Sequence, residues 1–206
     1  MPARFAAIAG CLALTAIGAI AGQPSRPEIA PFVGYRFGGA VTDATTGAGA
    51  SLDGAGAFGL IFDVPVQRGA DLEVLLSRQS TGVDLERYPE VTRFDLTVDH
   101  LMAGVRAHFP TRQRSVHPFL AVYVGLTHFS GDSGEVTADT RFAAALGGGA
   151  VFDLSPRVGV RLDARVYASF VESGAGLFCG GGGCSGVFGG SAMVQGEIAA
   201  ALVVKL

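Results

Sequence analysis

The sequence predicts an all-β fold, an eight-stranded antiparallel up-and-down transmembrane β-barrel. Apolar and polar residues alternate along most of the chain after residue 27, which is the period of a strand and not of a helix. Clusters of turn-forming residues separate these alternating segments at regular intervals. Charged residues make up only 16% of the 206 residues, well below the roughly 25% of a typical soluble domain. Such a chain is either a very apolar soluble domain or a protein that lives in lipid.

The composition excludes several classes of protein. Hydrophobic residues make up 49% of the chain, whereas disorder requires low hydrophobicity and high charge. The net charge of −3, without any stripe of Lys and Arg, argues against a nucleic-acid partner. Neither glycine run, 147–149 or 180–183, is followed by the Gly-Lys-Ser/Thr of a phosphate loop. The four His residues show no metal-ligand spacing, so we expect neither a cofactor nor a metal.

The N-terminus has the pattern of a secretory signal peptide. Arg4 is followed by an apolar run and by an Ala-x-Ala pattern that ends at Ala21, directly before the expected cleavage site. The run is too short and too rich in Ala and Gly for a good membrane-spanning helix. A lipoprotein signal at Cys11 is a weaker alternative, because the apolar run continues past it. The signal peptide, a short linker and the barrel domain are expected at 1–21, 22–27 and 28–206.

The alternating segments define the strands. Short turns alternate along the chain with long connections rich in Gly, Asp, Ser and Thr, which is typical of outer-membrane barrels. An even number of strands places both ends of the barrel domain on the side of the short turns. The predicted strands are 28–37, 51–64, 70–79, 93–109, 116–129, 141–153, 157–171 and 191–206. The predicted long loops are 38–50, 80–92, 130–140 and 172–190.

Each strand has its own pattern. The first follows the proline-containing linker, and the second carries an apolar face that ends at Val64. The third alternates Leu and Val with acidic and polar residues, and the fifth alternates them with small or aromatic residues. The sixth is rich in Ala and Gly. The seventh alternates Val, Leu and Ala with charged residues, and the eighth ends in alternating apolar residues at Leu206.

The fourth strand is less regular. Asp95 and Asp99 share parity with Leu101, on what is otherwise an apolar face. One explanation is a β-bulge near Asp99 that reverses the faces. We favour the other, in which the strand continues above the lipid, because about ten residues suffice to cross a bilayer.

The polar faces decide which side is outside. They carry many small residues and charges of both signs, which suit the narrow interior of an eight-stranded barrel, where opposite charges can pair. We therefore expect the apolar faces to point to lipid, and we keep a secreted soluble sandwich as the alternative. The predicted charge network in the lumen comprises Arg36, Asp53, Glu73, Arg161, Asp163, Arg165 and Glu197.

Six short segments give the chain a resemblance to a known family. They read PFVGYR (31–36), GLIFDVP (59–65), EVLLSRQ (73–79), HPFL (117–120), FDLSP (152–156) and RLDAR (161–165). The chain resembles small porin-like outer-membrane β-barrel proteins of the OmpA/OmpX type, although it ends in Leu206 where such proteins usually have an aromatic residue. The resemblance implies the outer membrane of a Gram-negative-type bacterium and a structural or surface-interaction role without catalysis. It also implies contact with outer-membrane lipids and lipopolysaccharide. We expect a monomer whose long loops are available to an extracellular ligand, and we keep a narrow porin-like channel as an alternative.

His128 and Ser130 suggest an enzymatic alternative. They lie two residues apart at the end of the fifth strand, so both should face outward. The pair resembles the His-x-Ser motif of outer-membrane lipid A deacylases, in which His would activate Ser and an acid such as Asp132 or Glu135 would orient the imidazole. Gly131 stands where that motif has Asn. The simpler interpretation is a polar pair at the edge of a loop.

Cys179 and Cys184 bracket four glycines in the last long loop. Once the signal peptide with Cys11 is removed, they are the two remaining cysteines of an exported protein. Because disulfides persist in oxidising compartments, we expect a disulfide between them, with free thiols as the alternative.

Overall fold

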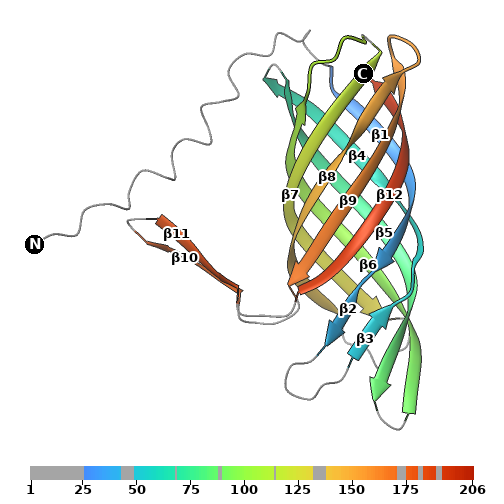
Figure 1. The fold of residues 1–206 in the computed structure, drawn as a ribbon, viewed down its shortest axis with the longest axis vertical. Coiled ribbons are helices and arrows are strands. Elements are labelled where there is room, and N and C mark those ends of the chain that lie inside the picture. Colours follow the sequence, from blue (N-terminus) through green and yellow to red (C-terminus); the bar gives the residue numbers. More distant parts are fainter. Residues whose placement is uncertain are drawn as a thin grey trace, which may run out of the picture.

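Eight long strands form a closed antiparallel barrel in the computed structural model (Figure 1). The structure describes residues 26–42, 49–67, 69–87, 90–113, 115–131, 138–170, 175–180, 183–188 and 192–206. The barrel strands are β1 (Glu28–Gly38), β4 (Ala55–Gln67), β5 (Ala70–Arg87), β6 (Glu90–His108), β7 (Val116–Gly131), β8 (Asp139–Asp153), β9 (Val158–Phe170) and β12 (Ala192–Lys205). Each pairs with the next in this order, and β12 pairs with β1, which closes the cylinder. The predicted fold class is confirmed.

Two ends of the barrel can be distinguished. At the end that we call the turn end, the Leu206 N–H donates a hydrogen bond of 2.9 Å to the Pro27 carbonyl, so the start and finish of the domain lie together. Gly69, with a φ of +80°, lies in the short turn between β4 and β5 at this end. At the opposite, loop end, β2 (Ala40–Thr42), β3 (Gly49–Leu52) and the far parts of β5 and β6 project beyond the cylinder (Figure 1).

The region 80–92, predicted as a loop, is mostly strand. β5 and β6 pair continuously from Ala70 opposite Ala107 to Arg87 opposite Glu90. An antiparallel pair continues wherever both chains stay extended. The parts of β5 and β6 that project beyond the cylinder therefore keep the same pairing as the parts within it. The absence of any register shift between these two strands rules out the bulge near Asp99.

Two other connections also contain strands. The single strand predicted at 51–64 is divided into β3, which ends at Leu52, and β4, which begins at Ala55. Both pieces pair with β5. The loop predicted at 172–190 contains the paired strands β10 (Ala175–Gly180) and β11 (Gly183–Phe188), which form a separate two-stranded sheet. The loop predicted at 38–50 likewise contains β2 and the first residues of β3. The regions 38–50 and 172–190 are both rich in Gly, which the sequence analysis took as a sign of loops.

The barrel is polar inside and apolar outside. Arg36 and Glu197 are essentially inaccessible to solvent, whereas Val33 and Ile198 on the same two strands are 68% and 57% exposed. This arrangement is the inverse of a soluble domain and is the one that lipid requires. The soluble sandwich is therefore ruled out, and the chain is a transmembrane β-barrel. The described residues include no helix that is both long and apolar enough to cross a bilayer.

Candidate functional site

A continuous set of ion pairs fills the middle and the turn end of the lumen. Strand alternation turns these side chains inward, and barrel closure brings together strands that are distant in sequence. We call this set the arginine ladder. Its members are Arg36, Glu197, Arg165, Asp163, Arg161, Glu73, Arg106, Asp63, Asp71 and Glu28.

The first section of the ladder joins the two strands that close the barrel. Arg36 on β1, Glu197 on β12 and Arg165 on β9 are register partners in one row. Arg36 donates to Glu197 Oε2 from Nε at 2.9 Å and from Nη2 at 2.6 Å, and Arg165 Nη1 donates to Oε1 at 2.9 Å. Ser77 accepts a further hydrogen bond from Arg36. One buried carboxylate thus balances two guanidinium groups.

The second section lies along β9 and crosses the lumen. Asp163 accepts from Arg161 Nε at 2.7 Å and lies 2.9 Å from Arg165 Nη2, so it links these two arginines. Arg161 in turn donates to both oxygens of Glu73 on β5, at 2.9 and 3.1 Å. Bidentate pairing of this kind fixes the orientation as well as the distance of the two groups.

Arg106 on β6 ends the ladder near the turn end, among four carboxylates. Its guanidinium nitrogens lie 2.8 Å from Asp71, 2.9 Å from Glu28, 3.5 Å from Asp63 and 3.7 Å from Glu73. Since burying an unpaired charge is strongly unfavourable, this concentration of acids is what allows a fully buried arginine at this depth.

Aromatic rings fill the space between the charges. Tyr123 donates to Glu73 at 2.5 Å, and Tyr167 donates to Glu197 at 3.1 Å. Gly104 makes room for Tyr123, because a Cβ there would lie 2.7 Å from the tyrosine ring. The Arg161 and Arg165 guanidinium groups lie 4.3 and 4.5 Å from the ring centres of Phe119 and Phe32.

Towards the loop end, the lumen contents change from charged to neutral and then to apolar. Gln195 donates to Gln79 at 3.2 Å. His100 stacks on Tyr167 with 4.4 Å between ring centroids, and its Nδ1 lies 2.8 Å from the Thr127 hydroxyl. A buried apolar cluster comes next, made by Val83, Leu96 and Val98 with Leu52 and Phe129 against it.

The structure brings together six of the seven lumen residues proposed from the sequence. Asp53 lies elsewhere, in the short break between β3 and β4 near the loop end, where its carbonyl accepts a 2.6 Å hydrogen bond from the Thr81 hydroxyl. The sequence analysis missed Arg106, although this residue shares parity with other inward residues of its strand. Of the four acids around Arg106, it included Glu73 and left out Glu28, Asp63 and Asp71.

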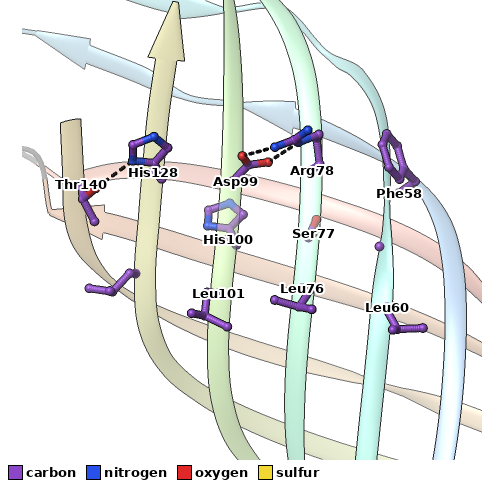
Figure 2. Close-up of a pocket in the computed structure, with 12 residues that line it drawn as sticks. Phe58, Leu60, Leu76, Ser77, Arg78, Asp99, His100, Leu101, His128 and Thr140 are labelled. Atoms are coloured by element: carbon purple, nitrogen blue, oxygen red, sulfur yellow. Dashed lines mark hydrogen bonds and ion pairs between the residues drawn. The ribbon is translucent and has the colours of Figure 1, made fainter. Parts of the chain in front are cut away.

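His128 and Ser130 both lie on the outer side of β7 near the loop end. The His128 Nδ1 is 2.8 Å from the hydroxyl of Thr140 on β8 (Figure 2). Ser130 is the register partner of Thr97. The candidate acids Asp132 and Glu135 lie outside the described residues.

Cys179 and Cys184 are register partners on β10 and β11. Directly opposed residues of an antiparallel pair have Cα atoms about 4.5–5.5 Å apart, which lies within the range that a disulfide spans. The disulfide remains a prediction.

In the described part of the chain, no group of three or more His, Cys, Asp and Glu residues has an arrangement that could hold a metal ion.

The closed barrel, its apolar outer wall and its charged interior define a small transmembrane β-barrel of the outer-membrane type. Solved structures share this fold. Neisserial surface protein A aligns with a TM-score of 0.59 and 15% identity, over 87% of this chain and 97% of that protein. The outer membrane protein AlkL, in lipid bilayers, aligns with a TM-score of 0.50 and 15% identity, over 100% of this chain and 98% of that one. No protein-family model and no curated protein matches the sequence. At this identity the likeness defines the fold and leaves the role open.

Proposed function

We propose that this protein is a closed barrel of a Gram-negative-type outer membrane with a structural or surface-interaction role. The arginine ladder is the observation that carries the proposal. It links β1, β4, β5, β6, β9 and β12 through ion pairs whose side chains are almost wholly buried. An eight-stranded barrel has an interior just wide enough for its side chains.

The energy of the ion pairs supports a permanently closed lumen. Removing one partner from a buried pair costs about 3–5 kcal/mol, because the other charge stays buried without compensation. A conducting path would require several ladder contacts to open together. Thermal fluctuations therefore populate such a state rarely, which argues against the narrow porin-like channel.

Recordings in planar bilayers test the closed lumen. The folded protein should give no discrete conductance steps in concentrated KCl. The control is a double variant, Arg161→Ala with Glu73→Ala, which removes a bidentate pair from the middle of the lumen. We expect this variant to conduct. Discrete steps in the unchanged protein would refute the proposal and favour the channel.

The surroundings of His128 support a role without catalysis. A hydrolase would need an acid on the imidazole nitrogen that faces away from the nucleophile. Here a hydroxyl, that of Thr140, lies at hydrogen-bond distance from Nδ1. We therefore expect no deacylation of lipid A by the folded protein. Deacylation that is lost in Ser130→Ala, with the barrel still folded, would restore the enzymatic alternative.

The loop end is the proposed contact surface for an extracellular ligand. The paired parts of β5 and β6 extend past the cylinder there, together with β2 and β3 (Figure 1).

Fractionation of cells, with a gel that compares boiled and unboiled samples, tests the location. A folded, faster-migrating form in the outer-membrane fraction is expected, and a soluble periplasmic protein would contradict the proposal.

A further inference from the structure

A groove with a volume of about 580 Å³ crosses the outer wall of the barrel from β4 to β8 (Figure 2). Its lower side is a row of leucines on adjacent strands, which are register partners. Leu60 lies opposite Leu76, Leu76 opposite Leu101, and Leu101 opposite Leu126. All four side chains are exposed on the outer face. This row belongs to the apolar band that faces lipid.

The upper side of the groove is polar. The next row of outward-facing residues toward the loop end contains Arg78 and Asp99. Arg78 donates to both oxygens of Asp99 at 2.7 Å, and the Arg78 side chain is 56% exposed on the outer wall. His128 and Thr140 continue this row, and Phe58 begins it (Figure 2). The change from leucine to charge therefore takes place over one row of residues on the same strands.

A third row above it carries hydroxyl groups. Ser80 is the register partner of Thr97, and Thr97 is the partner of Ser130. These three residues line a second hollow of about 570 Å³, directly above the first groove in register. Charged groups on a lipid-facing wall are tolerated near the interface and are costly at mid-depth. The Arg78–Asp99 pair therefore lies near the boundary between acyl chains and headgroups.

We propose that the two hollows together bind a glycolipid of the outer leaflet. The proposal rests on the membrane location given above. The acyl chains would lie on the leucine row, and the sugar headgroup would lie on the two polar rows. This would also give His128 and Ser130 a role in binding.

The mixture of polar groups favours a sugar over a simple anionic headgroup. Arg78 is already paired with Asp99, so the pair offers no net positive charge to an anionic headgroup, and the Asp99 carboxylate accepts hydrogen bonds from sugar hydroxyl groups. His128, Thr140 and the hydroxyl row offer further donors and acceptors at neighbouring positions. The exposed ring of Phe58 adds an apolar face beside them, against which a sugar ring can lie.

The absence of Trp from the chain permits a clean fluorescence test. Phe58→Trp places a single reporter in the groove, and Ile198→Trp on β12 is the matched reporter on an apolar part of the wall outside it. Each protein is reconstituted in phosphatidylcholine with brominated acyl chains, which quench the Trp. Lipid A, without bromine, is then added in steps. For each reporter, the measured quantity is the lipid A fraction that restores half of the quenched fluorescence. This fraction should be about tenfold lower for the reporter in the groove than for the control reporter.

Equal recovery at the two positions would overturn the proposal, because it would mean an ordinary lipid shell. Phosphatidylglycerol serves as an anionic lipid without sugar, and an equal preference for it would also overturn the glycolipid assignment. Arg78→Gln and Asp99→Asn should each reduce the preference, and Arg141→Gln, which removes an equal charge from a pair outside the groove, should leave it unchanged. If the barrel is folded and does not conduct but shows no preference for lipid A, the glycolipid site is refuted and the proposed closed barrel stands. If the unchanged protein conducts, the proposed closed lumen is refuted.

Discussion

Replacement of Glu197 by glutamine should destabilise the barrel far more than the loss of a charge at the surface. The Glu197 side chain is fully buried and accepts hydrogen bonds from Arg36, Arg165 and Tyr167. Arg165 keeps Asp163 as a partner in the variant, but Arg36 loses the one carboxylate within its ion-pair distance among the described residues. The amide NH₂ of glutamine would also face a guanidinium that can only donate. Breaking a buried pair in this way costs about 3–5 kcal/mol.

Two further variants separate the cost of leaving Arg36 unpaired from the general effects of a mutation on the unfolding free energy. Asp139→Asn removes the same charge from the partly exposed pair with Arg141, which lies at 2.6 Å, and such pairs contribute about 0–1 kcal/mol. The double variant Arg36→Gln with Glu197→Gln removes both charges and should be more stable than Glu197→Gln alone. This recovery distinguishes a stranded charge from a simple loss of packing.

Urea unfolding in lipid vesicles measures all of these variants. The folded fraction is read from the mobility of unboiled samples on a gel, and the unfolding free energy comes from linear extrapolation. We expect Glu197→Gln to shift the midpoint strongly to lower urea, with a small shift for Asp139→Asn. Equal shifts for the two variants, or a double variant less stable than Glu197→Gln, would refute the idea that the ladder balances buried charges.

Three further predictions concern other parts of the chain. Gly104→Ala should lower the unfolding free energy by about 1–3 kcal/mol through overpacking, because the added Cβ would lie 2.1 Å from a carbonyl oxygen of β7. An added Cβ at Gly56 would have no atom within 4 Å, so Gly56→Ala should be nearly neutral in the same urea assay. The mature protein should contain no free thiol, so a maleimide reagent should label Cys179 and Cys184 after reduction only; labelling without reduction would exclude the disulfide. N-terminal sequencing of the protein from membranes should begin at Gly22, and a start at residue 1 would contradict the signal peptide.

Alternation, the spacing of the turns, and the small residues and opposite charges of the polar faces together predicted the barrel and most of the ladder. Two inward arginines on one strand need carboxylates nearby, and the narrow interior supplies Glu73 to Arg161 and Glu197 to Arg165 from other strands. Asp163 links the two arginines from its place between them on the same strand. The parity of a residue determines its face, because side chains alternate strictly along a strand. The inward position of Arg36 and Glu197 was accessible to sequence reasoning for this reason.

Partner choice was less accessible. The neighbours of Arg106 come from β1, β4 and β5, and the tilt and register of these strands determine which acids reach it. Parity carries no information on height within the barrel, so Asp53 was grouped with the ladder although it lies near the loop end. The extension of β5 to Arg87 was missed because polar residues in water can form an antiparallel pair as readily as a loop.

The bond between the first and last barrel strands has a consequence for the order of assembly. Arg36 and Glu197 are 161 positions apart, so they meet only when β12 arrives beside β1. Until then the charged inward faces of β1, β5, β6, β9 and β12 would be exposed to lipid, which does not tolerate them, and a single strand also leaves its backbone groups unpaired in the bilayer. Insertion and closure must therefore take place as one cooperative event. A chain that stops before residue 192 should accumulate as an uninserted intermediate and not as a smaller barrel.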